Sequence, residues 1–191
     1  MCRHLAYLGP PAPLARWLFT APHGLARQSW APTDMRGGGT VNADGFGVGW
    51  YPVGSGSALR YRRATPLWSD PDLVRLAGGV QSGAVLAAVR SATEGMPVVE
   101  TAAAPFTDGR WLFSHNGRVT GWPGSVAALA GRLPVTDLLT LDAPTDAALL
   151  WALVRHRLRA GAAPAEAVAG TVAAVAAAAP ESRLNLLLTD G

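Results

Sequence analysis

The residue best placed to do chemistry is Cys2, because it directly follows the initiator methionine. Removal of Met1, which a small second residue permits, would leave Cys2 with a free α-amino group beside its thiol. An α-amine with a reference pKa of about 7.7–8.0 can accept the proton of a thiol whose reference pKa is about 8.5. Cys2 could therefore act as a nucleophile without a separate histidine or aspartate. A buried, unreactive cysteine is the alternative that position alone leaves open.

An Asn-Gly pair, Asn116 and Gly117, follows the apolar run at residues 111–114. Such a pair after a strand is first of all typical of a turn. The functional alternative is an oxyanion hole, made by the Asn116 side-chain amide and the Gly117 backbone N–H. One such donor stabilises a transition state by roughly 2.7–4 kcal/mol. The pair taken alone favours the turn.

Two charged residues are candidates for holding the two ends of an amino-acid substrate. Arg90 follows the apolar run at residues 84–89, and a guanidinium there can bind a carboxylate through two parallel hydrogen bonds. A structural ion pair is the alternative for Arg90. Asp146 follows Thr145 at an expected helix start, where either residue could be the N-cap. The Asp146 carboxylate could also bind a substrate ammonium.

Motifs typical of phosphate binding and of metal binding do not match this sequence. The glycine-dense segment at residues 42–50 is followed by neither a basic residue nor a helix, which excludes a phosphate-binding loop. We expect close backbone packing or a bulge beside the active strand instead. We predict no metal and no cofactor, because zinc-ligand spacing is absent among the four histidines, His4, His23, His115 and His156.

Composition limits the class of protein. Hydrophobic residues make up 49% and charged residues 15% of the 191 residues, which predicts a compact globular protein. All 16 basic residues are arginine, and their scatter gives little support for nucleic-acid binding, even at the densest groups, residues 60–63 and 155–159. A single cysteine excludes an intrachain disulfide. Without a signal peptide or an apolar segment long enough to cross a membrane, we expect a cytoplasmic protein.

Periodicity predicts the elements that must position these residues. Strands are expected at residues 2–8, 46–52, 59–63, 84–89, 111–114 and 184–189, and helices near residues 14–18 and at 72–78, 145–158 and 164–178. A flexible connection at residues 54–57 predicts a hairpin. The polar segment at residues 23–44 is interpreted as a long, functional loop. No linker divides the chain, so we predict one α+β domain over residues 1–191, with helices covering a largely antiparallel sheet.

Taken in order, four short motifs resemble the glutaminase site of class II glutamine amidotransferases, which belong to the N-terminal-nucleophile hydrolase superfamily. The motifs are Cys2 and residues 90–93, 115–117 and 145–146. The resemblance covers essentially the whole chain and implies a four-layer α/β/β/α sandwich. Residues 1–6, 42–50, 89–95 and 103–106 leading into 115–117 are similar in particular to the branch that hydrolyses γ-glutamyl hercynylcysteine sulfoxide in ergothioneine biosynthesis. One departure is Ala88, where many amidotransferases carry a histidine.

This resemblance implies a role for each matching residue. Cys2 would attack the γ-glutamyl carbonyl, and water would hydrolyse the resulting thioester to release glutamate and hercynylcysteine sulfoxide. The oxyanion hole would be formed by Asn116 and Gly117. Substrate contacts are implied for Arg90, which would bind the α-carboxylate, Asp146, which would bind the α-ammonium, and Thr93 and His115.

Two other functions remain open from the sequence. A generic glutaminase could supply ammonia to a separate synthetase, and it would prefer free glutamine over a γ-glutamyl thiohistidine precursor. A catalytically inactive binding protein of the same fold would be favoured by retention of Met1. Recognition of the non-glutamyl half of the substrate is assigned, as a hypothesis, to His23, Gln28 and Trp30 in the long loop.

The last two residues of the sequence are typical of a hairpin turn. Asp190 and Gly191 follow the expected last strand, and Asp-Gly after a strand predicts a hairpin with a return strand. A last strand without that partner would keep an unpaired edge. We therefore expect the natural protein to continue past residue 191, with a C-terminal part of the sandwich beyond it.

Overall fold

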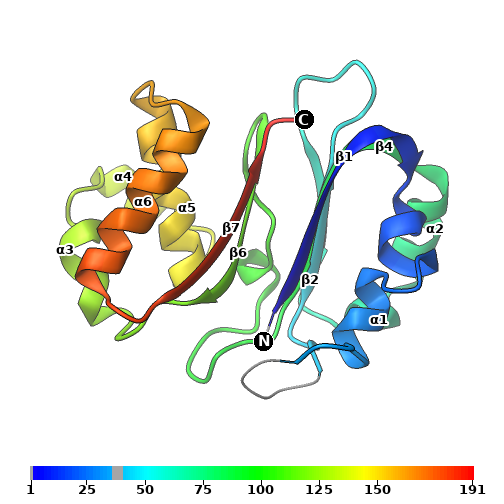
Figure 1. Ribbon diagram of the computed structural model, residues 1–191, viewed down its shortest axis with the longest axis horizontal. Coiled ribbons are helices and arrows are strands. Elements are labelled where there is room, and N and C mark those ends of the chain that lie inside the picture. The colour runs from blue at the N-terminus through cyan, green and yellow to red at the C-terminus, as the bar shows by residue number, and fades with distance from the viewer. Residues whose placement is uncertain (1, 36–40) are drawn as a thin grey trace.

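Two antiparallel sheets face each other between two layers of helices, so the fold is the expected four-layer α/β/β/α sandwich (Figure 1). The structure, a computed structural model, describes residues 2–35 and 41–191. The termini of this trace lie at opposite ends of the space between the sheets (Figure 1).

The first sheet, sheet A, is built from four strands in the order β1-β4-β2-β3. Its strands are β1 (Arg3–Pro13), β2 (Phe46–Trp50), β3 (Leu59–Arg63) and β4 (Gln81–Val89). The β2–β3 pairing confirms the predicted hairpin. β2 and β4 are the two central strands, which explains why β2 is buried along its whole length.

The second sheet, sheet B, has the order β5-β6-β7. Its strands are β5 (Phe106–Asp108), β6 (Trp111–Arg118) and β7 (Arg183–Thr189). β6 pairs with β7 from Leu112 opposite Thr189 to Arg118 opposite Arg183. β7 is an edge strand of the sheet within the described residues.

The helices form the two outer layers (Figure 1). Sheet A is covered by α1 (Leu25–Trp30) and α2 (Pro71–Gly79). The layer on sheet B contains α3 (Ala127–Ala130), α4 (Val135–Leu139), α5 (Asp146–Arg159) and α6 (Pro164–Ala178). One short π-helix, η1 (Arg16–Thr20), lies among the described residues. The described residues also contain short 3₁₀ helices, η2 (Leu67–Ser69), η3 (Glu100–Ala102) and η4 (Gly124–Val126).

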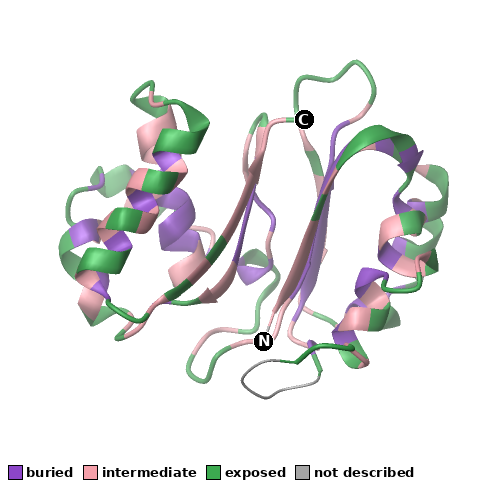
Figure 2. Ribbon diagram, viewed as in Figure 1, coloured by how far each residue is buried: buried purple, intermediate pink, exposed green. Residues whose placement is uncertain are grey.

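Apolar side chains fill all three spaces between the layers, and Figure 2 shows buried residues gathered along these contacts. Phe113 stacks on Trp151 where sheet B meets α5, with ring centroids 5.4 Å apart. Phe46 and Val48 pack in the cluster between sheet A and its helices. Leu112 contributes to a smaller cluster between the sheets. Burial on both faces therefore holds each sheet in the middle of the sandwich.

The glycines of β2 let the two sheets approach, as the sequence predicted for this segment. A Cβ on Gly47 would lie 2.3 Å from the carbonyl oxygen of Ala104. A Cβ on Gly49 would lie 2.6 Å from a methyl group of Leu112 on β6. Neither position has room for a side chain, so these glycines set the spacing between β2 and the segment that enters sheet B.

Several sequence-based expectations need correction. The interpretation of residues 23–44 as one long loop is wrong, because α1 forms there; its 6 residues are too few for a periodicity signal. For the same reason β5, α3 and α4 were not predicted. The strand expected at residues 111–114 continues to Arg118. Residues 36–40 of the expected loop lie outside the described residues. Among the described residues, no helix combines the length and apolarity needed to cross a bilayer.

Candidate active site

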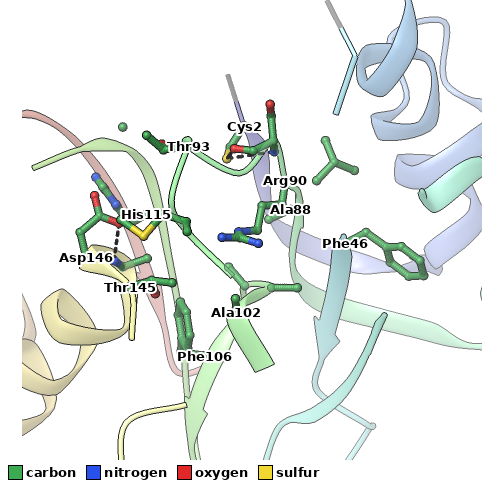
Figure 3. Close-up of a pocket in the computed structure, with 17 residues that line it drawn as sticks. Cys2, Phe46, Ala88, Arg90, Thr93, Ala102, Phe106, His115, Thr145 and Asp146 are labelled. Carbon is green, nitrogen blue, oxygen red and sulfur yellow. Dashed lines mark hydrogen bonds between the residues drawn. The ribbon is translucent and has the colours of Figure 1, made fainter. Parts of the chain in front are cut away.

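The sheet register brings the motif residues together. In the antiparallel pair β1–β4, Arg3 lies opposite Val89, so Cys2 before one strand and Arg90 after the other are neighbours. The resulting pocket lies where β1, β4, β6 and the start of α5 meet (Figure 3). Every predicted site residue except Asn116 lines it, namely Cys2, Arg90, Thr93, His115, Gly117 and Asp146.

The Cys2 thiol is half-buried and contacts both backbone polar groups of Ser91. Its Sγ lies 3.5 Å from the Ser91 carbonyl oxygen, and the Ser91 N–H donates to Sγ at 3.4 Å. Burial raises the pKa of the Cys2 thiol, although the Ser91 amide and the charge of Arg90 oppose this effect. The thiol therefore needs a base close to it to become a nucleophile near neutral pH. Ser91 belongs to the motif at residues 90–93, but its contact with sulfur was not predicted.

Arg90 presents a cation that has no carboxylate partner among residues 2–35 and 41–191. Its Nη1 donates to the Pro97 carbonyl at 2.8 Å. Its backbone is fixed by hydrogen bonds to Gly45 (2.7 Å) and from Asp44 (3.0 Å). The structural ion pair, the alternative interpretation of Arg90, is therefore not observed within the described residues. A half-buried guanidinium left with donors to spare is suited to binding the carboxylate of a ligand.

Asp146 lies across the pocket from Arg90, at the first turn of α5 (Figure 3). Thr145 is the N-cap, and its side chain accepts from Ala148 N–H at 3.3 Å. The Asp146 carboxylate accepts from Val119 N–H at 3.0 Å and from Ala147 N–H at 2.8 Å. The carboxylate is thus fixed by two backbone donors at the positive end of the helix. Its orientation is set before any ligand arrives.

The structure rules out the turn interpretation of Asn116 and Gly117. Both residues lie inside β6, where they pair with Asn185 and Leu184 of β7. A Cβ on Gly117 would lie 1.7 Å from the Arg183 carbonyl oxygen, so this position requires glycine for steric reasons. The local turn preference gives way because the whole segment gains ladder hydrogen bonds with a strand far along the chain.

The Asn116 side chain lies on the opposite face of β6 from that of His115. Side chains alternate along a strand, so Asn116 shares a face with Ser114, whose hydroxyl oxygen lies 3.1 Å from Nδ1 of His4 on β1. That face is turned toward sheet A. The Asn116 carbonyl accepts from Asn185 Nδ2 at 2.8 Å. Its side chain is not among those that line the pocket, so its part in an oxyanion hole stays a prediction.

His115 is buried beside the pocket, and its Nε2 lies 3.2 Å from the Arg183 carbonyl oxygen. Because a carbonyl only accepts, this nitrogen carries the proton, which leaves Nδ1 as an acceptor in the neutral ring. Burial lowers the pKa of His115 and favours that neutral ring, although Asp146 opposes the effect. His115 can therefore accept a hydrogen bond from a ligand near Asp146.

A second buried histidine makes stability depend on pH. Burial, and secondarily the repulsion that a protonated His115 would exert, lowers the pKa of His4 from 6.5 to about 4. The unfolded chain then binds a proton more readily than the folded one, so stability falls as pH drops from 6.5 toward 4. Because each tenfold difference in proton affinity corresponds to about 1.4 kcal/mol, the loss attributable to His4 is about 3 kcal/mol.

We therefore expect urea unfolding of wild type at pH 7, 5.5 and 4.5 to show a falling free energy of unfolding. His4→Asn should fall less steeply over the same interval. Replacement of exposed His23 by Asn is the matched control and should keep the wild-type slope. Equal slopes for wild type and His4→Asn would contradict the assignment.

The remaining lining residues are mostly apolar and were not predicted. They include Phe46, Ala88, Met96, Phe106 and residues 102–104. Ala88, the departure from the usual histidine, thus contacts the same space as Cys2. His23, Gln28 and Trp30 are not among the lining residues, so their assignment to the non-glutamyl half of a substrate gains no support. Among the described residues no group of three or more His, Cys, Asp or Glu is placed to hold a metal.

An α/β/β/α sandwich with a cysteine leading its first strand into a charged pocket is the architecture of an N-terminal-nucleophile hydrolase. The sequence profile of the family Glutamine amidotransferases class-II matches residues 25–191. The chain therefore belongs to the class II glutamine amidotransferase family.

Individual relatives support the same placement. The γ-glutamyl-hercynylcysteine sulfoxide hydrolase of Mycolicibacterium smegmatis is 41% identical over 191 residues, which is 100% of this chain and 76% of that protein. The protein of the same name from Mycobacterium tuberculosis is 38% identical over 194 residues, which is 100% of this chain and 73% of that protein. A probable glutamine amidotransferase of Saccharomyces cerevisiae is 32% identical over 162 residues, 80% of this chain and 44% of that protein.

Solved structures agree with the fold. A glutamine aminotransferase class-II domain protein from Silicibacter pomeroyi superposes with a TM-score of 0.68 at 26% identity, covering 100% of this chain and 73% of that one. The glutamine phosphoribosylpyrophosphate amidotransferase of B. subtilis superposes with a TM-score of 0.64 at 12% identity, covering 100% of this chain and 35% of that one. The second likeness bears on the fold alone.

Proposed function

We propose that this chain is an amidohydrolase that cleaves the γ-glutamyl amide of γ-glutamyl hercynylcysteine sulfoxide, with Cys2 as nucleophile after removal of Met1. One observation carries the proposal. The Cys2 thiol shares a pocket with a half-buried Arg90 that lacks a carboxylate partner in the described residues and with a fixed Asp146 carboxylate across from it.

The charges of this pocket match the head of a glutamyl group. Arg90 would bind the α-carboxylate, and Asp146, with Nδ1 of His115 as a second acceptor, would bind the α-ammonium. Holding both ends of the amino-acid head orients the side chain, whose γ-carbonyl would then reach Cys2. Fixed orientation of this kind lowers the barrier by removing entropy before the chemical step.

The chemical steps use groups of this chain alone. The freed α-amine of Cys2 would take the thiol proton, and the thiolate would attack the γ-carbonyl carbon. Backbone and amide donors at Gly117 and Asn116 would stabilise the oxyanion. The C–N bond then breaks, and the leaving amine takes the proton from the α-ammonium. The α-amine then takes a proton from a water molecule, whose oxygen attacks the thioester carbonyl carbon. The C–S bond breaks, the thiolate takes the proton from the α-ammonium, and glutamate is released.

The identity of the leaving half is supported by the relatives. Two proteins named γ-glutamyl-hercynylcysteine sulfoxide hydrolase match the whole chain at 41% and 38% identity. The test is a comparison of kcat/KM for γ-glutamyl hercynylcysteine sulfoxide and for free glutamine, with intact-mass confirmation that Met1 is removed. We expect the γ-glutamyl sulfoxide to be strongly preferred. Faster release of ammonia from glutamine would instead indicate a glutaminase.

Arg90→Lys should not behave as a conservative change. A lysine ammonium cannot reproduce the planar two-point contact with a carboxylate, so binding and orientation of the substrate should both suffer. We expect kcat/KM to fall about 100-fold. The matched control is Arg75→Lys on the exposed face of α2, which should leave kinetics unchanged. A wild-type kcat/KM for Arg90→Lys would refute the carboxylate contact.

Asn116→Ala tests the oxyanion assignment. An oxyanion donor acts mainly in the transition state, so kcat should fall about 100-fold while KM changes little. Asn185→Ala is the control, because Asn185 lies opposite on β7 and its side chain donates to the backbone carbonyl of Asn116, not to the side-chain amide. Its kcat should stay near wild type. A change in KM alone for Asn116→Ala would remove Asn116 from the oxyanion hole.

A further inference from the structure

Arg62 on the edge strand β3 points toward loops that line the pocket. The β2–β3 register places Arg62 opposite Gly47, so the two share one face of sheet A. That face lies against the segment containing Ala104, whose carbonyl closely approaches Gly47. Arg62 belongs to the basic group at residues 60–63, and its side chain points toward the interior of the protein and not toward solvent.

A single guanidinium contacts the two segments that lead into opposite walls of the pocket. Nη1 of Arg62 donates to the Thr101 carbonyl at 3.2 Å, and Nη2 donates to Asp142 Oδ1 at 3.0 Å. Thr101 directly precedes the lining residues 102–104, and Asp142 lies just upstream of Asp146. The Arg62 side chain is 10% exposed and that of Asp142 is 22% exposed. The pair is thus largely shielded from water, where such contacts are least weakened.

Hydrogen bonds inside each of the two loop segments fix the shape of that segment but not its position relative to the other segment. Ala103 N–H donates to Glu100 at 3.0 Å, and Thr145 N–H donates to Ala143 at 2.8 Å. Each of these bonds stays inside its own segment. Arg62 is one of two arginines of β3 that connect the segments to each other and to sheet A, and of the two it lies closer to Asp142.

The charges favour positioning over stability as the role of this contact. Arg60 lies 3.9 Å from the same Asp142 oxygen and donates to Pro105, so two cations share one carboxylate. Shielded ion pairs add little net stability, because loss of hydration offsets the attraction. What the arrangement does supply is a fixed separation between two loops.

We propose that Arg62 is a positioning residue of the site. By holding Thr101 and Asp142 together, it fixes the distance between the wall at residues 102–104 and the wall that carries Asp146. Its effect on substrate binding rests on the proposed function, whereas its effect on the loops does not.

The test compares Arg62→Ala, Arg62→Lys and Asp142→Asn with wild type. Arg63→Ala is the matched control, because Arg63 is the next residue of β3 and pairs with Glu100 at 3.7 Å with both side chains well exposed. Hydrogen–deuterium exchange of residues 99–105 and 142–147 reports the loops directly. Steady-state kinetics with the γ-glutamyl sulfoxide report KM and kcat separately.

We expect faster exchange in both segments for Arg62→Ala and Asp142→Asn, and a KM raised about tenfold with kcat lowered less than about threefold. Arg62→Lys, which keeps the charge but contacts only one partner, should lie between these variants and wild type. Arg63→Ala should match wild type. Asp142→Asn preserves shape and keeps the test valid if Arg62→Ala does not fold.

Two results would overturn the proposal. Unchanged exchange in either segment would show that Arg62 does not hold the walls. A lower melting temperature with unchanged KM would show a merely structural contact. If wild type hydrolyses no γ-glutamyl substrate, the proposed function fails, and the exchange measurements still decide whether Arg62 positions the loops.

Discussion

Cys2→Ala should abolish hydrolysis, with a loss of kcat on the order of 1,000-fold or more, while the variant still binds its substrate. The nucleophile is lost, but Arg90 and Asp146 keep their positions because their hydrogen bonds do not involve the Cys2 side chain. Calorimetry should therefore give a dissociation constant close to wild type. Alanine, like cysteine, is small enough to permit removal of Met1, so the two N-termini stay comparable.

Two further measurements make this result specific. Cys2→Ser should also be very slow, since a hydroxyl is a much weaker nucleophile than a thiol at its free pKa. Rapid acid quenching of wild type with substrate should trap a glutamyl adduct, seen by intact mass, that Cys2→Ala cannot form. Retention of a tenth of the wild-type rate in Cys2→Ala would exclude the thioester mechanism.

Gly117→Ala should cost stability and activity together. The added Cβ would lie 1.7 Å from the Arg183 carbonyl oxygen, a backbone atom that cannot rotate away. β6 and β7 must separate locally, and the same shift removes the His115 contact with that carbonyl. We expect the free energy of unfolding to fall by about 3 kcal/mol or more, measured by urea unfolding.

Gly78→Ala provides the control for Gly117→Ala. Gly78 lies in α2, and a Cβ there would meet no atom within 4 Å. Alanine also favours helix over glycine, so this variant should gain up to about 1 kcal/mol. If Gly117→Ala unfolds at the same urea concentration as wild type, the close approach of β6 and β7 in this structure is wrong.

The sequence alone was enough to predict the residues that meet in the pocket and several of the elements that position them. Cys2 stands out as a candidate because removal of the preceding methionine would give it both a thiol and a free α-amine. Thr145 and Pro164 mark helix starts by local hydrogen bonding and fixed backbone angle, and α5 and α6 begin where these signals predict. Strong signals of this kind depend only on neighbours in the chain.

Other features were decided by contacts between distant segments. Asn116 and Gly117 form strand instead of turn because β7, far along the chain, pairs with them. The alternatives for Arg90, ion pair or ligand contact, are separated only by seeing which carboxylates surround it. Arg62 and Asp142, 80 positions apart, meet only once the sandwich forms. Local sequence determines which backbone conformations are low in free energy. Burial and sheet pairing, which bring remote residues together, determine which of these conformations the protein adopts.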